Sequence, residues 1–286
     1  MTVGSDHSPS LGPGRAGTSV VPVFFLSDST GISAETMGNA LLIQFPDLVF
    51  ERRLIPFISS VQEAQRVVGV LDAAMDGPVT PLAFTTAAVD EIRAVLHTSR
   101  CPIIDFFEMH MDRVEAILGV RGMHVASRLH GVGDVRRYNN RMAAVEFAIE
   151  HDDGQSVRAL EKSDVILLAP SRCGKTPTTM YLALQHAVFV ANYPLVEEDF
   201  ESADLPRPVR RLRDRCFGII STPQRLSQVR AERRANSRYA SLEQCTYELR
   251  KAEAMFRAHR VPSVNSSAMS VEEMSTVIMQ RMNIKS

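Results

Sequence analysis

The sequence has no tryptophan, no surplus of charge of either sign and no long apolar segment. Its 32 basic and 33 acidic side chains nearly balance, which leaves a formal net charge of −1. Nucleic-acid binders usually carry a basic surplus with aromatic side chains for stacking, so this composition argues against a nucleic-acid partner. No apolar run approaches the roughly 18 residues that a membrane-spanning helix needs. We therefore expect neither nucleic acid nor membrane as a partner.

Cysteine is also scarce, and the four cysteines stand far apart without a C-x-x-C pair: Cys101, Cys173, Cys216 and Cys245. This spacing fits neither a disulfide scaffold nor a zinc site and is typical of the reducing cytoplasm. Residues 1–20 are rich in Gly, Ser and Pro and lack the apolar core of an export signal. We expect them to form a disordered tail, and we expect the protein to be cytoplasmic.

What the first half does contain is a regular alternation of apolar and amphipathic segments. Strands are expected at 21–26, 48–55, 79–85 and 103–107, and helices at 33–45, 60–75, 89–97 and after the fourth strand to about 118. Ser60 and Glu63 are expected to form a capping box at the second helix. Strict alternation predicts a parallel sheet with helices on both faces. Four glycines and no clear period at 119–138 indicate a loop or linker.

The centre of the second half is Ala169-Pro170-Ser171-Arg172-Cys173-Gly174-Lys175-Thr176, which lies between an expected buried strand and an expected helix. This is the layout of a phosphate-cradling loop, in which backbone N–H groups and a helix N-terminus hold phosphate oxygens. Lys175 would neutralise the outer phosphates, and the Thr176 hydroxyl can ligate Mg²⁺. Ala169 stands where the usual pattern has glycine. The alternative is an ordinary strand–turn–helix with an incidental lysine.

Two residues inside this loop have open interpretations. Arg172 is either a second phosphate contact or a solvated loop charge. Cys173 is either an oxidation-sensitive thiol or, as we favour, a small filler.

The other expected elements of the second half are helices at 139–150, after the loop, at 223–234, from 241 and from 270, and strands at 165–168, 188–193, 217–221 and 261–264. We predict an α/β fold with two parallel-sheet domains. The N-terminal domain, 21–138, is doubly wound, and the C-terminal domain, 139–286, is a nucleotide-binding domain of the P-loop kinase type.

Acidic residues beside the phosphate loop are candidates for the chemistry. No apolar strand of the second half ends in Asp, so the metal-holding acid usual in phosphate-loop enzymes is missing from its expected place. Shortly before the loop's strand, a helix is followed by His151, Asp152 and Asp153. Because no strand-end Asp is present to hold the metal, Asp152 or Asp153 is favoured for that role. The alternative is a solvated loop.

A second candidate site follows the first strand of the chain. Asp28, Ser29, Thr30 and Gly31 lie where ligands bind in open α/β sheets and could hold a second phosphate or the substrate. Helix capping and turn chemistry explain the same residue types equally well. Two arginine-rich stretches, 207–215 and 225–238, could grip a phosphorylated partner, whereas a solvated helix face is the plainer interpretation for most of these arginines.

Several motifs, taken in their order along the chain, resemble one family. They are FFLSDSTGISAET near residue 24, HDDG at 151, SRCGKTPT at 171, ANYP at 191 and RLSQVRAERRANSRYA at 225. Together they resemble the phosphoenolpyruvate synthase regulatory proteins, relatives of the pyruvate, phosphate dikinase regulatory proteins, from about residue 21 to the C-terminus. The form of the loop is more similar to the synthase-directed branch.

The resemblance implies a bifunctional serine/threonine kinase and phosphorylase. Such proteins inactivate phosphoenolpyruvate synthase by phosphorylating an active-site Thr with ADP as donor, and reactivate it with inorganic phosphate, releasing pyrophosphate. It also implies that the segment 169–176 binds the nucleotide and that the protein is a homodimer. We hypothesise that Lys175 neutralises the ADP β-phosphate and that Thr176 helps to hold Mg²⁺. Asp153 or Asp152 would serve the hydroxyl of the target Thr, with His151 beside them. The alternatives are a small-metabolite kinase and a non-catalytic nucleotide-sensing adaptor.

Overall fold

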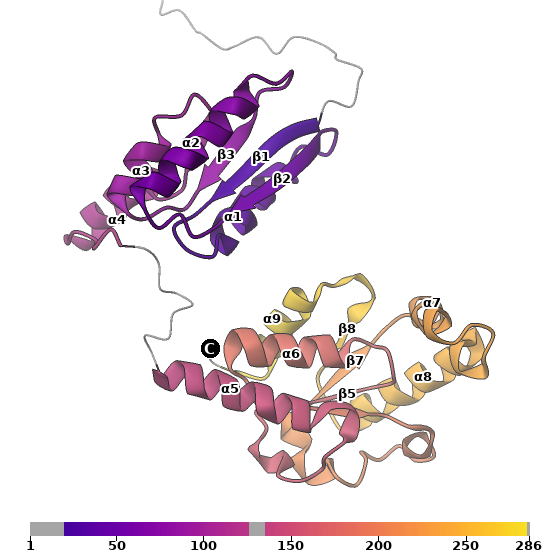
Figure 1. Cartoon of the computed structure of the whole chain (residues 1–286). Helices are drawn as coiled ribbons and strands as arrows, with labels where there is room; N and C mark the ends of the chain where they lie inside the picture. The colour runs from indigo at the N-terminus through magenta and orange to yellow at the C-terminus, as the bar shows by residue number, and fades with distance from the viewer. Residues whose placement is uncertain (1–19, 126–134, 285–286) are drawn as a thin grey trace, which may run out of the picture. The chain divides into compact units, whose positions relative to one another are not determined.

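The computed structural model describes residues 20–125 and 135–284. The chain divides into two compact units, Met1–Gly131 and Val132–Ser286 (Figure 1). The division falls before the boundary expected after residue 138, because α5 (Val135–Glu150) begins within the expected linker. Residues 135–138 contain no Gly or Pro, so nothing in their sequence stops the helix from extending toward its N-terminus. Most of the expected disordered tail lies outside the described residues.

The first unit is a four-stranded parallel sheet in the order β2-β1-β3-β4. Its elements are β1 (Val20–Leu26), α1 (Ile32–Leu42), β2 (Val49–Ile55), α2 (Val61–Met75), β3 (Leu82–Thr85), α3 (Asp90–Leu96), β4 (Ile103–Asp105) and α4 (Glu108–Leu118). Alternate residues of β1 pack against α1 on one face and against α2 and α3 on the other. The predicted doubly wound arrangement is confirmed.

The ends of several elements differ from the expectation for local reasons. β3 begins after Pro81, which has no N–H to donate to a neighbouring strand. β4 ends at Asp105 because its Oδ1 accepts hydrogen bonds from the N–H groups of Phe107 and Glu108 and so starts α4. The capping box expected at α2 is only half formed. Ser60 Oγ accepts from the Glu63 N–H, but the Glu63 carboxylate accepts from the N–H and hydroxyl of Ser59 instead.

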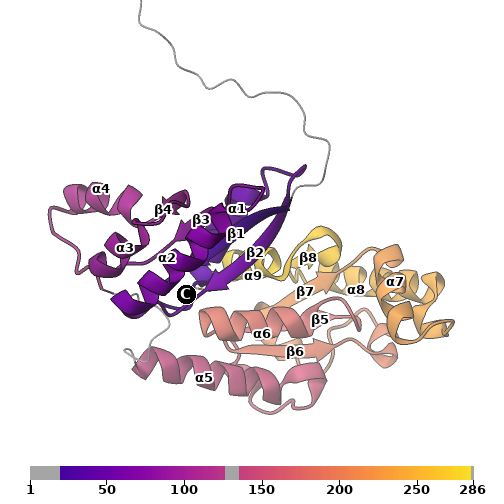
Figure 2. The same cartoon turned by 45° about the horizontal axis from the view of Figure 1, so that its top comes forward.

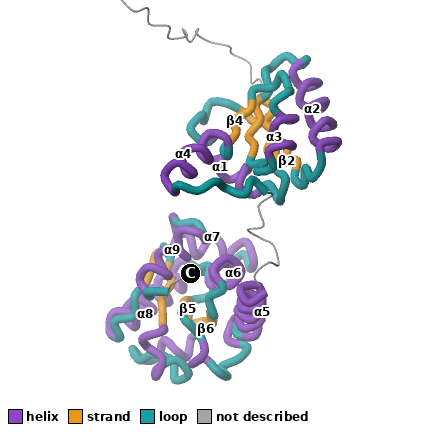
Figure 3. The backbone as a smooth tube through the Cα atoms, turned by 90° about the vertical axis from the view of Figure 1, so that its left-hand side faces the viewer, coloured by secondary structure: helices purple, strands orange, loops and turns teal. Residues whose placement is uncertain are grey.

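The second unit repeats the topology of the first, with all-parallel strands in the order β6-β5-β7-β8. Besides α5, its main elements are β5 (Val165–Ala169), α6 (Lys175–His186), β6 (Val190–Pro194), β7 (Cys216–Ile220), α7 (Pro223–Arg233), α8 (Leu242–Ala258), β8 (Ser263–Asn265) and α9 (Val271–Arg281). Figure 3 shows the strands of each unit lying between helices. The predicted fold class, two parallel-sheet domains, is confirmed.

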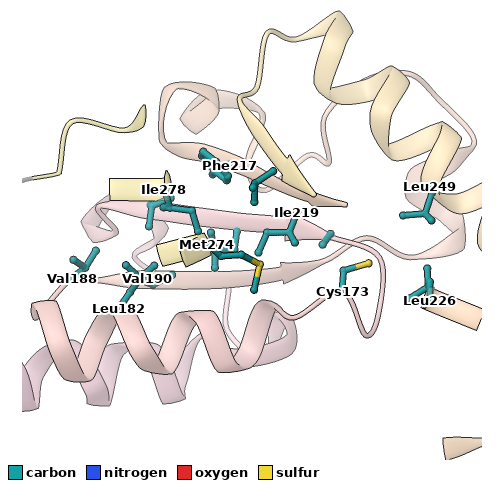
Figure 4. Close-up of a cluster of buried hydrophobic side chains, with 14 of the residues drawn as sticks. Cys173, Leu182, Val188, Val190, Phe217, Ile219, Leu226, Leu249, Met274 and Ile278 are labelled. Atoms are coloured by element: carbon teal, nitrogen blue, oxygen red, sulfur yellow. The ribbon is translucent and has the colours of Figure 1, made fainter. Parts of the chain in front are cut away.

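The core of the second unit is built on β5, all of whose residues are buried. One face of this strand packs with α6 and α9, including Leu182, Met274 and Ile278 (Figure 4). The other face packs with α5 and α8, and α5 runs beside α6 through small alanine contacts (Figure 2). Among the described residues, no helix combines the length and apolar character that crossing a membrane requires.

The strand order places two loops where ligands bind in folds of this class. In each unit the chain leaves the sheet in opposite directions from the two central strands, which are β1 and β3 in the first unit and β5 and β7 in the second. Ligands of open α/β sheets bind at the carboxyl ends of the strands at this switch point. The predicted phosphate loop follows β5, and the segment 28–31 follows β1. Each predicted site therefore lies at the switch point of its own unit.

Candidate nucleotide-binding site

The phosphate loop joins a fully buried strand to the start of a helix. β5 ends at Ala169, and α6 begins at Lys175. Two loop residues adopt left-handed backbone conformations, Arg172 at φ 72° and Gly174 at φ 96°. Only glycine adopts the second of these without strain. Ala169 itself belongs to the buried core cluster, so its methyl group is taken up by packing.

The N-terminus of α6 is free to bind an anion. Its first residues carry no side-chain cap, and Thr178 Oγ1 donates instead to the Gly174 carbonyl at 2.8 Å. The unpaired N–H groups and the positive end of the helix dipole together attract phosphate oxygens. The twelve residues of α6 make this dipole fully developed over three turns.

Lys175 is the cation at this helix start. Its side chain is almost entirely buried, and Nζ donates to the Pro170 carbonyl at 3.2 Å across the loop. Burial holds the pKa of Lys175 below its ordinary value, although the charges of Asp152 and Asp153 act in the opposite direction. A phosphate in the loop would supply the counter-charge that this buried ammonium lacks.

A cluster of three oxygen-bearing side chains adjoins the loop. Asp152 Oδ1 accepts from the Thr176 hydroxyl at 2.9 Å and from Asn192 Nδ2 at 2.5 Å, and Asn192 Nδ2 also lies 3.2 Å from Thr176 Oγ1. The sequence could not choose between Asp152 and Asp153 for this position, and the structure places Asp152 beside Thr176. Asn192, on β6, was missed, although it belongs to the ANYP motif.

The same cluster suits Mg²⁺ by its chemistry. Mg²⁺ prefers hard oxygen ligands and often binds through one carboxylate, water and substrate phosphates. Asn192 is almost wholly buried, and its Oδ1 has no hydrogen-bond partner among the described residues. Buried polar atoms are rarely left without a partner. A metal-bound water at this oxygen would satisfy it.

Asp153 and His151 have different surroundings from Asp152. Asp153 is exposed and adopts a left-handed backbone at φ 47°. His151 is buried and stacks on Phe147, with ring centroids 3.9 Å apart. Its Nδ1 and Nε2 lie 2.8 and 2.7 Å from the carbonyl oxygens of Phe147 and Arg158. The imidazole therefore anchors the start of the acidic turn and does not reach the loop's open side.

Cys173 behaves as the small filler that the sequence favoured. It is 2% exposed and packs in the core cluster beneath the loop (Figure 4). Burial raises the pKa of its thiol to about 12. A buried thiol with so high a pKa is a poor nucleophile. Arg172, by contrast, is exposed at the outer side of the loop.

The candidate site of the first unit is occupied largely by its own hydrogen bonds. Asp28 is buried, and its Oδ2 accepts from the N–H groups of Ala88 and Val89 at the start of α3. Ser29 N–H donates to Ser27 Oγ, and Gly31 takes φ 78° at the start of α1. Thr30 is half-buried. Asp28 is thus engaged in hydrogen bonds to the turn just before α3, and a ligand at Asp28, Ser29, Thr30 and Gly31 stays a prediction.

Two further features of the described residues, a possible metal site and a cavity, are weaker candidates than the phosphate loop. His97, Asp105 and Glu108 bring three potential metal ligands together, but Arg93 Nε lies 3.9 Å from Asp105 Oδ2 and would repel a cation. In the second unit a cavity of about 1200 Å³ is lined by Asp164, Phe189 and Arg215. These residues precede β5, β6 and β7, so the cavity lies at the opposite ends of the strands from the phosphate loop.

Known proteins are similar in sequence to most of this chain. A family model described as kinase/pyrophosphorylase matches residues 23–279. A protein of Legionella pneumophila (strain Corby) is 42% identical over 258 residues, which cover 90% of this chain and 95% of that protein. Proteins of Neisseria meningitidis serogroup B and Bordetella pertussis are 42% and 40% identical over 264 residues, covering 92% of this chain and 97% and 96% of theirs. The names of all three include the description phosphoenolpyruvate synthase regulatory protein.

Proposed function

Because the chain belongs to the kinase/pyrophosphorylase family, we propose that it regulates phosphoenolpyruvate synthase by two opposed phosphoryl transfers. In the inactivating direction, the hydroxyl of an active-site Thr of the synthase attacks the β-phosphorus of ADP and releases AMP. In the reactivating direction, inorganic phosphate attacks the phosphothreonine phosphorus, which frees the Thr hydroxyl and forms pyrophosphate.

The observation that carries this proposal is the meeting of three features at one loop. The free N-terminus of α6, the buried Lys175 and the Asp152–Thr176–Asn192 cluster together suit a diphosphate with a bound cation. The inactivating reaction starts from a P–O–P linkage, in ADP, and the reactivating reaction produces one, in pyrophosphate. One cradle of this kind therefore serves both directions, since such transfers depend on positioning and charge neutralisation.

The roles of the acids follow from their surroundings. Asp152 is engaged with Thr176, so it holds the metal, and Mg²⁺ would neutralise charge on the transferring phosphate. Asp153 is exposed, and its charge is felt at Lys175. It is the carboxylate available to accept the proton of the target Thr. His151 holds the turn that carries both acids and transfers no proton.

The test is transfer from ADP labelled at the β-phosphate to purified phosphoenolpyruvate synthase. The reaction is run with and without phosphoenolpyruvate, which loads the target's catalytic histidine. We expect acid-stable label on a Thr of the synthase, and none with Lys175→Ala. Label from ATP or on a small molecule would instead support a metabolite kinase. Tight ADP binding without any transfer would support a nucleotide-sensing adaptor.

A further inference from the structure

One arginine of the basic helix α7 is not solvated. Arg230 is fully buried, whereas Arg225 and Arg233 on the same helix are exposed. Neither interpretation of the 225–238 stretch, a grip on a partner or a solvated face, describes a buried guanidinium. A buried charge requires nearby partners to offset its lost hydration.

Those partners come from two other segments. Arg230 Nη1 and Nη2 donate to Glu248 Oε1 and Oε2 of α8 at 3.1 and 2.6 Å, which is the two-pronged geometry of strong guanidinium–carboxylate pairs. Nη1 also donates to the Tyr239 carbonyl at 3.0 Å, and the guanidinium stacks 4.2 Å from the Tyr239 ring. Burial lowers the pKa of Arg230, but Glu248 outweighs that effect, so the pKa stays above its ordinary value.

The remaining donors of Arg230 reach the phosphate loop. Nε and Nη2 donate to the Ser171 carbonyl at 3.3 and 3.1 Å. The hydroxyls of Ser171 and Tyr239 lie 2.9 Å apart and share a hydrogen bond. Ser171 is therefore held through both its backbone and its side chain.

Anchoring the Ser171 carbonyl also fixes the direction of the Arg172 N–H. The peptide bond is planar and trans, so the Ser171 C=O and the Arg172 N–H point in opposite directions. With the carbonyl turned to the buried guanidinium, the N–H of Arg172 is turned away from it. Arg172 also adopts φ 72°, a conformation that a non-glycine residue keeps only when its surroundings enforce it.

We propose that Arg230, itself oriented by Glu248 and Tyr239, is a positioning residue that presets the phosphate cradle by anchoring the Ser171 carbonyl. The inference rests on the proposed function, because it assumes that the loop binds a nucleotide. A lysine at 230 would keep the charge but could not serve Glu248, Tyr239 and Ser171 together, since an ammonium lacks the planar fork of donors.

The test compares Arg230→Lys with Arg233→Lys, a matched change at an exposed position of the same helix. We expect Arg230→Lys to weaken Mg-ADP binding at least tenfold by calorimetry, at a temperature where circular dichroism shows the variant folded. Arg233→Lys should bind as the unaltered protein does. Hydrogen exchange without ligand should quicken in the peptide covering 170–174 and stay unchanged in β5, whereas general destabilisation would quicken both.

Several outcomes separate this inference from its alternatives. A folded Arg230→Lys variant with unaltered ADP affinity and loop exchange would overturn it. If Arg230→Lys does not fold, the same binding and exchange measurements are made on Glu248→Gln. This variant keeps the side-chain shape while removing the charge that orients Arg230. Tyr239→Phe removes only the bond to the Ser171 hydroxyl and should weaken binding by a smaller factor. Failure of the unaltered protein to bind ADP would instead contradict the proposed function and this inference with it.

Discussion

Asp152 and Asp153 are neighbours in the chain, yet the structure gives them different surroundings. Asp152 is half-buried and bonded to Thr176, whereas Asp153 is exposed with a left-handed backbone. We expect Asp152→Asn to raise the Kd of ADP about tenfold in the presence of Mg²⁺ and to leave it unchanged in EDTA, because the change removes a metal ligand. Calorimetry in both buffers measures this. An equal loss in EDTA would mean that Asp152 supports the loop itself.

Asp153→Asn should act on the rate and not on binding. Loss of a general base typically costs a factor of about 10²–10⁴, so we expect label transfer to the synthase to slow by roughly that much while the Kd of ADP changes less than twofold. Single-turnover transfer and calorimetry separate the two quantities. A variant that only binds ADP more weakly would remove Asp153 from the proton-transfer step.

Lys175 gives the site a pH dependence of known sign. Its pKa in the ligand-free protein lies below its ordinary value, and a bound diphosphate would raise it. ADP binding should therefore take up protons, and affinity should fall as the pH rises through the lowered pKa of Lys175 toward its ordinary value. Calorimetry in buffers of different ionisation enthalpy reports the uptake directly. Lys175→Met should bind weakly at every pH and show no uptake, and an equal uptake in that variant would assign the proton elsewhere.

At this scale the sequence predicted the residues that act locally and missed those that act across the fold. The loop could be predicted because its strand, glycine, lysine and threonine follow one another in the chain, and the structure has this strand–loop–helix layout. Asn192 reaches Asp152 because β6 lies against the turn that carries this acid, with the Asn192 N–H donating to the His151 carbonyl at 3.0 Å. Arg230 reaches Ser171 from 59 residues away. In both cases a single polar residue within an apolar or basic stretch gives no sign of the partner that the fold will supply.

At the scale of elements, α4 is unusual because none of its residues is buried. A charged link holds the segment after this helix in place. Glu115 accepts from the Gly122 N–H and lies 2.7 Å from His124 Nε2, and His124 Nδ1 lies 2.8 Å from Asp90 at the start of α3. These two carboxylates raise the pKa of His124 above its ordinary value. The link between α3 and α4 therefore depends on a protonated histidine.

This link gives a second pH prediction, now for stability. A histidine whose pKa is raised by folding contributes stability that is fully present below its unfolded-state pKa, near about 6.5. This contribution is lost as the pH rises through its folded-state pKa. We expect His124→Gln to lower the Tm by a few degrees at about pH 5.5 and by much less at about pH 9. His110→Gln, an exposed histidine of α4, is the control. A Tm difference that does not vary with pH would mean that His124 stabilises by packing.

Element types were predicted better than element ends, for a physical reason. Helix starts with a serine cap, such as Ser241 and Ser270, fall where expected, because the cap is a local hydrogen bond. Strand ends depend on the length of the neighbouring strand and cannot be predicted from the local sequence. β8, for example, begins at Ser263, directly after Pro262, whose carbonyl accepts a hydrogen bond from the Gly218 N–H of β7.

At the scale of the whole molecule, both units have the same strand order, although the sequence shows no internal repeat. Topology of this kind follows from how crossovers connect parallel strands and needs no sequence similarity between the units. Each unit has its own buried clusters. Every residue that we assign to nucleotide binding belongs to the second unit.

We therefore expect a fragment comprising Val132–Ser286 to fold alone and to bind Mg-ADP within about threefold of the full chain. The reason is that the cradle, Asp152 and the Arg230 anchor all depend on contacts within this unit, and a domain with its own core can fold independently. Cooperative thermal unfolding and calorimetry measure the two properties, with Lys175→Ala in the fragment as the non-binding control. A folded fragment that binds ADP far more weakly than the full chain would show that the first unit contributes to the nucleotide site, and Ser29 and Thr30 would then be the first residues to change.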